Sequence, residues 1–270
     1  MNRQGKDKIE YLNYTFNPVT GCLHPCKDQY CYAKKIANRF GHNSIIEACM
    51  FKDKPKIYDL HYPVTYSRDY GHDLMGNPVV KDYIDPYPAG FAPTFHRYRL
   101  DEPTKKKQPS IIGVVYMGDL FGEWVPDEWI EEVFKACEEA PQHTYMYLTK
   151  NPERYAKFAP LIRKNYWIGF TNTYADNDRM KYFGYAHWLD NCKKFVSIEP
   201  LLGEPTTFNH QVDWVIIGQQ TGTGAVPPKS EWVQSIIEQC RAAAIPVFVK
   251  NPLYEQFPIQ EWPDGLDGKS

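Results

Sequence analysis

The chain has 270 residues, of which 43% are hydrophobic and 24% charged, and its formal net charge is −2. The longest apolar runs, such as residues 212–218, are too short to cross a bilayer, so the composition excludes a membrane protein. The N-terminal sequence MNRQGKDKIEYLNY has no apolar signal segment, so we expect a cytoplasmic protein. The small net charge gives no global reason to bind nucleic acid, and the basic cluster at residues 105–107 is typical of a solvated loop.

The second half of the chain alternates short β-branched runs with stretches that carry apolar residues at helical spacing. This alternation is typical of successive βα units around parallel strands. We expect strands at Tyr11–Phe16, Ile112–Met117, Thr144–Thr149, Tyr166–Thr171, Lys194–Ile198, Trp214–Gly218 and Val247–Lys250. We expect helices at Tyr32–Phe40, Pro126–Glu139, Pro152–Lys164 and Glu231–Ala244.

These elements predict the α/β class, with a full or partial parallel β/α (TIM-like) barrel that spans residues 1–270 as one domain. A doubly wound sheet fits the strand series less well. Between residues 42 and 110 the pattern gives way to Tyr, Pro, Asp and Gly without clear periodicity. This segment has too many aromatic residues for a disordered region, so we expect an irregular insertion that packs over one end of the barrel. The alternative is a surface decoration or an oligomer contact.

Three of the seven cysteines, Cys22, Cys26 and Cys31, lie on one short segment with the spacing C-x-x-x-C-x-x-x-x-C. Such clustering points to a metal or cluster site, because reducing compartments disfavour structural disulfides. Three thiolates on one loop can reach three corners of a [4Fe–4S] cluster and leave the fourth iron open to a small molecule. A structural zinc would need a fourth ligand, which His24 or a distant residue could supply, so zinc remains an alternative.

At these cysteines the chain resembles the radical S-adenosylmethionine superfamily, whose loop after the first barrel strand carries C-x-x-x-C-x-x-C with an aromatic residue before the last cysteine. Tyr30 stands at the aromatic position, and the last gap here is four residues rather than two. The chain also resembles an uncharacterised phage-associated family of that superfamily, which has N-P-x-T-G-C at the first cysteine and C-Y-A at the last. Later blocks that match this family are YMGDLF at 116–121, YLTKNPERY at 147–155, YWIGFTNTY at 166–174, FVSIEPLLG at 195–203 and DWVIIG at 213–218.

The resemblance implies that S-adenosylmethionine binds at the C-terminal ends of the strands. A motif at the second strand would bind its methionyl amino group, a polar residue on the fourth strand its ribose, and the fifth and sixth strands its adenine. The residues implied in this way, together with the aromatic position, are Tyr30, Gly118, Asp119, Thr171, Asn172, Ser197, Glu199 and Gly218. The family's usual Gly-Gly-Glu-Ser-Gly and Arg-Pro are replaced here by GQQTG at 218–222 and VP at 226–227, which leaves the substrate contacts undefined.

Polar residues also follow the predicted strands, whose C-terminal ends converge on one face of a β/α barrel. Asp119 and Glu199 come directly after apolar runs, where an acid without a partner is costly to bury, and this favours a site. Other strand-end residues, such as Thr171, could equally cap helices. Lys150 and Lys250 could hold an anion at this face or lie at the surface with their stems along the rim.

The resemblance therefore implies an iron–sulfur enzyme that reductively cleaves S-adenosylmethionine to start radical chemistry, with an electron donor such as flavodoxin or ferredoxin and no membrane partner. It assigns no catalytic residue. The phage association suggests a small-molecule or nucleic-acid substrate, such as a nucleotide or a base. Aromatic residues of the insertion could stack on a base or form the insertion's own core; they are Tyr66, Tyr70, Tyr83, Tyr87 and Phe95. The alternative is a non-enzymatic zinc or iron–sulfur module that binds nucleic acid or a protein partner.

Overall fold

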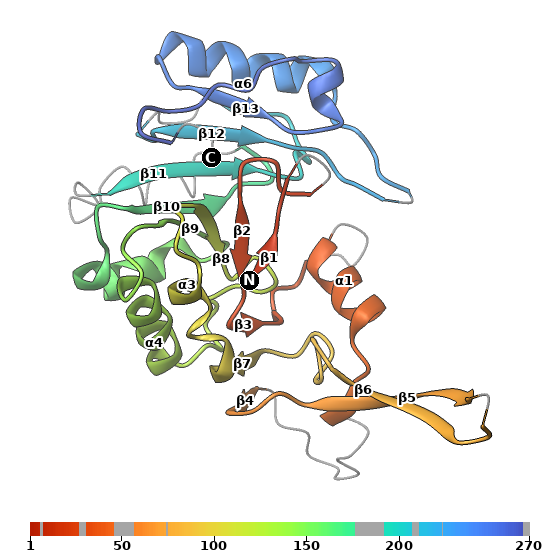
Figure 1. Cartoon of the computed structure of the whole chain (residues 1–270). Coiled ribbons are helices and arrows are strands. Elements are labelled where there is room, and N and C mark those ends of the chain that lie inside the picture. The colour runs from red at the N-terminus through yellow and green to blue at the C-terminus, as the bar shows by residue number, and fades with distance from the viewer. Residues whose placement is uncertain are drawn as a thin grey trace.

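The computed structural model describes residues 1–5, 8–26, 31–45, 57–73, 75–175, 192–206, 211–222 and 224–266. Its largest element is an eight-stranded sheet (Figure 1). In their order across the sheet, the strands are β1 (Asn2–Arg3), β2 (Tyr14–Phe16), β8 (Ile111–Val114), β9 (Thr144–Thr149), β10 (Tyr166–Thr171), β11 (Lys193–Ile198), β12 (Trp214–Ile217) and β13 (Val247–Val249). Strand β1 is antiparallel to β2, and every other neighbouring pair is parallel.

All the predicted strands are present, and β9 and β10 have the predicted bounds. The α/β class with a large, mostly parallel sheet is therefore confirmed. Strand β2 and strands β8 to β13 follow one another in space as they do in sequence, whereas a doubly wound sheet reverses its order at a switch point. In the described part of the chain, no strand pairing joins β13 to β1 or β2.

Helices α1 (Tyr32–Phe40), α4 (Asp127–Glu138) and α6 (Ser230–Ala242) form at the predicted places. The prediction of an α-helix over 152–164 is wrong in type, because Pro152–Leu161 form a 3₁₀-helix, η2. Pro160 lacks the amide hydrogen that an α-helix needs and disfavours the α conformation in the residue before it. None of the helices in the described ranges has the length and apolarity that a bilayer span requires.

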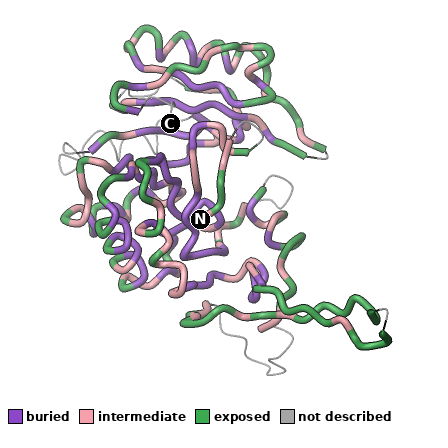
Figure 2. The backbone as a smooth tube through the Cα atoms, viewed as in Figure 1, coloured by how far each residue is buried: buried purple, intermediate pink, exposed green. Residues whose placement is uncertain are grey.

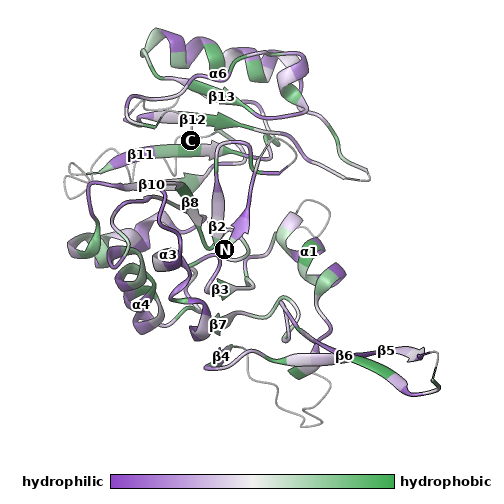
Figure 3. Ribbon diagram, viewed as in Figure 1, coloured by the Kyte–Doolittle hydropathy of each residue, from purple (hydrophilic) through white to green (hydrophobic). Residues whose placement is uncertain are grey.

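The two faces of the large sheet carry different apolar clusters. Helices α4, η2 and α6 all pack on one face, in a single cluster that includes Ile112, Tyr147 and Val215 of the strands. The opposite face holds a second cluster, which includes Trp167 and Trp214. Side chains alternate between the faces along each strand, and each face carries an apolar cluster, so the strands are apolar on both sides. Much of β12 and β13 is accordingly coloured hydrophobic in Figure 3. Such double burial explains why these strands were visible in the sequence as apolar runs.

The segment that precedes β2 reaches the far edge of the sheet. The Glu10 carboxylate accepts hydrogen bonds from the Asn251 amide nitrogen at 2.8 Å and from the Gln260 side chain at 2.9 Å, both next to β13. The Tyr11 ring meets the rings of Trp214 and Phe248 edge-on, at centroid distances of 5.8 and 6.0 Å. Side chains rather than strand pairing therefore connect the beginning of the sheet to its end.

The expectation of an irregular insertion over 42–110 is wrong where this segment forms strands and helices. Here lie β4 (Tyr58–Leu60), β5 (Thr65–His72), β6 (Pro78–Ile84), β7 (Thr94–His96), η1 (Arg97–Arg99) and α3 (Glu102–Lys105). Strands β4 and β7 join β3 (Val19–Thr20) in a small sheet, and β5 and β6 form a separate hairpin. The hairpin projects from the body and is largely exposed (Figures 1 and 2). Its strands lack an apolar face, which removes the sequence pattern by which strands are recognised.

Phe134 on α4 tests the core between the helices and the sheet. It is 2% exposed and packs against the rings of Phe121, Tyr147 and Phe158. Phe134→Ala should lower the free energy of unfolding by about 3–5 kcal/mol, because it leaves a cavity in this cluster. Phe40→Ala on α1, where the ring is 51% exposed, is the matched control and should cost less than about 0.5 kcal/mol. Urea unfolding measures both, and equal losses would contradict this core assignment.

Candidate functional site

The cysteine loop begins at a close backbone approach between two glycines. The Gly21 amide donates to the Met117 carbonyl at 2.9 Å, and Gly21 and Gly118 form an isolated parallel bridge. A Cβ on Gly118 would lie 2.6 Å from the Gly21 carbonyl oxygen. Gly21 itself has φ 83, and a Cβ there would lie 2.3 Å from the Ala92 carbonyl oxygen. Glycine at both positions lets the loop lie directly against the segment that follows β8.

The thiols of Cys22, Cys26 and Cys31 are half-buried and form no disulfide. Cys22 donates its amide to the Phe91 carbonyl at 3.2 Å, and its sulfur accepts the His24 amide at 3.4 Å. The pKa of the Cys22 thiol is raised to about 12, mainly by burial; the His24 amide lowers it, and the neighbouring Asp119, Cys26 and Cys31 contribute to the increase. The three cysteines are therefore electrostatic neighbours. Tyr30, predicted to stand beside the last cysteine, lies outside the described residues.

The chemistry of these donors suits iron–sulfur or zinc binding. The hydrogen bond from the His24 amide favours the thiolate form of Cys22, whereas burial and the neighbouring charges oppose it. A bound cation would balance the charge and stabilise the thiolate. Thiolate donors select Fe–S clusters and zinc rather than magnesium or calcium. Within the described residues, no group of three His, Cys, Asp or Glu side chains is already arranged to hold a metal ion. The assignment of the three cysteines as ligands stays a prediction.

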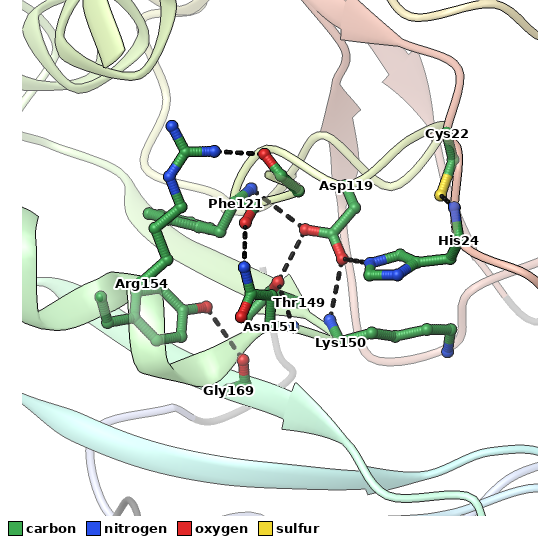
Figure 4. A network of polar contacts seen from close by, with 11 residues as sticks. Cys22, His24, Asp119, Phe121, Thr149, Lys150, Asn151, Arg154 and Gly169 are labelled. Carbon is green, nitrogen blue, oxygen red and sulfur yellow. Dashed lines mark hydrogen bonds and ion pairs between the residues drawn. The ribbon is translucent and has the colours of Figure 1, made fainter. Parts of the chain in front are cut away.

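Asp119 connects the cysteine loop to the large sheet (Figure 4). Its carboxylate is 4% exposed and accepts the Phe121 amide at 3.0 Å and the Thr149 hydroxyl at 2.7 Å on one oxygen. The other oxygen is 2.8 Å from the Lys150 amide and 2.8 Å from Nε2 of His24. Protein donors thus engage both oxygens, which gives Asp119 a positioning role at the loop. Its predicted contact with the cofactor amino group stays a prediction.

The block YLTKNPERY supports the turn that carries Asp119. The Asn151 side chain donates to the Phe121 carbonyl at 3.0 Å, and Asn151 also donates its amide to the Thr149 hydroxyl at 2.9 Å. The Arg154 guanidinium donates to the Gly122 carbonyl (Figure 4). It also donates to the Val125 carbonyl at 2.6 Å. These contacts hold residues 119–125 in a fixed turn, so this block has a structural role.

The other residues expected to bind the cofactor lie together at the C-terminal ends of β10, β11 and β12. Thr171 pairs with Ser197 across β10 and β11, and the Asn172 amide donates to the Ser197 carbonyl at 2.9 Å. Gly218 follows β12, and a Cβ there would lie 2.9 Å from the Glu199 carboxyl carbon. The structure therefore brings these residues into one group. The absence of a side chain at Gly218 makes room for the Glu199 carboxylate.

Sequence reasoning missed the partners of Glu199. Its carboxylate forms an ion pair with Lys250, whose side chain is 11% exposed, so Lys250 is not a surface lysine. Burial raises the pKa values of Tyr11 and Tyr116, and the charge of the nearby Glu199 raises them as well. The Tyr32 hydroxyl donates to the Tyr116 carbonyl, next to the bridge at Gly118. Tyr32 is the second residue of the matched motif C-Y-A and Tyr116 is the first residue of YMGDLF, which was the signal available in the sequence.

Two groups of residues therefore meet at the segment 116–119. One is the cysteine loop with His24 and Asp119, and the other is the Glu199–Lys250 pair with its tyrosines. The first group offers sulfur donors. The second offers one cation, one carboxylate and three phenols beside an apolar floor that includes Trp214 and Phe248.

Asp119→Ala tests the positioning role of this carboxylate. The change leaves the Phe121 and Lys150 amides without a hydrogen-bond acceptor, so the free energy of unfolding should fall by at least about 3 kcal/mol. Asp127→Ala is the control, because that carboxylate is part-exposed and pairs with Arg154 and Lys157 at the surface; it should cost about 1 kcal/mol. Urea unfolding at neutral pH measures both. A loss at Asp119 no larger than the loss at Asp127 would refute the positioning role.

Comparison with known proteins identifies a family for this chain. No curated protein and no solved structure matches it. One family model matches residues 6–256, a span that contains the cysteine loop, the projecting hairpin and every parallel strand of the large sheet. The chain therefore belongs to the family described as "Protein of unknown function (DUF5131)".

Proposed function

We propose that the chain is an iron–sulfur enzyme that reductively cleaves S-adenosylmethionine to start radical chemistry. One observation carries the proposal: the three-cysteine loop directly follows β2 and β3 and is tied to the C-terminal ends of β8 and β9, beside the polar groups that end β10, β11 and β12. The resemblance to the radical S-adenosylmethionine superfamily supplies the identity of the cofactor. The sulfur donors and the adjacent polar groups support it.

We infer further that the large sheet is a partial parallel β/α (TIM-like) barrel. The sequential strand order and the packing of α4, η2 and α6 on one face support this interpretation, because a barrel places its helices outside. The contacts of Glu10 and Tyr11 near β13 support it as well. In such a barrel the C-terminal strand ends form the ligand-binding face.

In this proposal Cys22, Cys26 and Cys31 bind a [4Fe–4S] cluster and leave one iron open. When bound, the cluster and S-adenosylmethionine supply reductive carbon–sulfur cleavage, with electrons from a donor such as flavodoxin or ferredoxin. Asp119 holds the cysteine loop through His24. Glu199 and Lys250 orient polar groups of the cofactor, and the apolar floor excludes water from the reacting atoms.

The substrate class in this proposal is a small molecule or a nucleic-acid base, suggested by the phage association of the resembling family. Part of the 42–110 insertion borders the cysteine loop, since Phe91 accepts the Cys22 amide and Tyr87 packs against Ala33 and Met117. Residues 87–96 therefore belong to the surroundings of the cysteine loop. Of the five aromatic residues considered for base stacking, Tyr87 and Phe95 are buried. Tyr66, Tyr70 and Tyr83 are therefore the candidates for stacking on a base.

Cysteine variants test the cluster. Changing Cys22, Cys26 or Cys31 to Ala should reduce iron and sulfide incorporation during anaerobic reconstitution below about a tenth of wild type, because a cubane held by two thiolates is poorly retained. Colorimetric iron and sulfide assays and electron paramagnetic resonance of the reduced protein measure this. The wild type should form 5′-deoxyadenosine and methionine from S-adenosylmethionine after reduction.

Cys240→Ala is the matched control, because Cys240 is buried on α6 against the far part of the sheet and should be dispensable for the cluster. Cys26→Ala protein that still loads fully would contradict the proposal. A colourless zinc protein that does not cleave the cofactor under reduction would instead favour the non-enzymatic binding module.

Glu199→Gln tests the second group of the site. The change keeps the shape of the side chain but removes the charge that pairs with Lys250. Iron content should be unchanged, and the affinity for S-adenosylmethionine should fall about 10-fold, the usual effect of losing a hydrogen bond to a charged group. Anaerobic calorimetry measures the affinity, with the exposed Glu204→Gln as control. Wild-type affinity in Glu199→Gln would remove Glu199 from the cofactor site.

A further inference from the structure

The β5–β6 hairpin sorts its side chains by chemical type between its two faces. Tyr66 lies opposite Tyr83, and Arg68 lies opposite Lys81, so these four side chains share one face. Tyr70 joins them, since its hydroxyl is 2.8 Å from the Tyr83 hydroxyl. We call this surface the tyrosine face; with the adjacent His42, its residues are His42, Tyr66, Arg68, Tyr70, Lys81 and Tyr83.

The rings of the tyrosine face form a continuous aromatic surface with two cations beside it. His42 stacks on Tyr66 with ring centroids 3.5 Å apart, and Tyr66 stacks on Tyr83 at 5.7 Å. The Arg68 guanidinium and the Lys81 ammonium lie 5.5 and 5.7 Å from the centroid of the Tyr70 ring. Tyr70 is 51% exposed, so part of this residue is accessible to a ligand beside the two positive charges.

The acidic residues of the two strands lie on the other face. Ser67 opposes Asp82 and Asp69 opposes Val80, and the Ser67 hydroxyl donates to the Asp82 carboxylate at 2.6 Å. The described residues of β5 and β6 therefore place no carboxylate on the tyrosine face. This local segregation places the two cations with the aromatic rings on one face and the strand carboxylates on the other.

The stability of the fold does not explain why aromatic and cationic side chains share one face of the hairpin. The hairpin projects from the body and pairs with no other strand in the described part of the chain, and most of its residues are exposed (Figure 2). A two-stranded ribbon without a buried face gains little stability from its side chains. Exposed tyrosines that bury no core are typical of a binding surface.

We propose that the tyrosine face binds single-stranded nucleic acid. Proteins that bind single strands combine rings on which bases stack with cations that follow the phosphates, and this face has both within one short ribbon. The stacking rings favour a single strand over a duplex, whose bases are already stacked on one another. The absence of carboxylates on the described face removes the repulsion that phosphates would meet. The proposal deepens the nucleic-acid alternative for the substrate of the proposed function, but the surface lies outside the cysteine loop, so its binding test does not depend on the cluster.

Binding of a fluorescein-labelled oligothymidine of about 20 nucleotides to the full chain tests the proposal by fluorescence anisotropy. Tyr70→Ala should weaken binding about 10-fold, because it removes a stacking ring. The double variant Arg68→Gln/Lys81→Gln should weaken it and lower the slope of log affinity against log salt by about 1.4, which corresponds to two phosphate contacts on a single strand.

Matched controls are present elsewhere in the chain. Lys105→Gln/Lys107→Gln removes the same charge from the exposed cluster beside α3, and Tyr254→Ala removes a part-exposed ring on η4 (Leu253–Glu255). Both controls should bind as wild type does. The proposal fails if the oligothymidine does not bind, if the controls lose as much affinity as the tyrosine-face variants, or if polyglutamate competes equally well. Tighter binding of a duplex of the same length would also overturn the proposal, because it would indicate that the hairpin binds in a groove of double-stranded nucleic acid.

Discussion

The arrangement of the candidate site depends on one buried carboxylate. Asp119 accepts hydrogen bonds from the turn after β8 and from the end of β9, and its second oxygen meets His24 of the cysteine loop. A carboxylate removed from water must be fully hydrogen-bonded, so these partners are not interchangeable with solvent. The cysteines are consequently fixed relative to the sheet by a contact between residues 95 positions apart in sequence.

The two proposed functional surfaces use different supports. The cysteine loop and the Glu199–Lys250 pair rest on strands that are buried on both faces, where small displacements are resisted by close packing. The tyrosine face rests on a ribbon that contributes nothing to the core. A rigid support suits chemistry, which requires fixed distances, whereas an exposed ribbon suits adaptable contact with a chain-like ligand.

The sequence predicted the strands of the large sheet that are buried on both faces, and it did not predict the strands of the hairpin, which have no buried face. Strands such as Thr144–Thr149 were located because both of their faces are buried and they therefore read as apolar runs. The hairpin could not be located, since neither of its faces is buried. Asp119 and Glu199 were found as acids after apolar runs, but the Lys250 partner of Glu199 was not, because an ion pair across 51 residues depends on the packing of the sheet.

The end of β8 shows how one backbone conformation shapes the site. Ile112 and Val114 face the helices, so regular alternation would send residue 115 to the opposite face and residue 116 toward the helices. Val115 instead has φ 58, a left-handed conformation that is costly for a β-branched residue, and its amide donates to the Phe16 carbonyl at 2.8 Å. The alternation reverses, so Val115 packs with the helices and Tyr116 turns to the face of Glu199. The predicted strand over 112–117 ends early for this reason, and its early end puts Tyr116 beside the charged pair and Gly118 beside the cysteine loop.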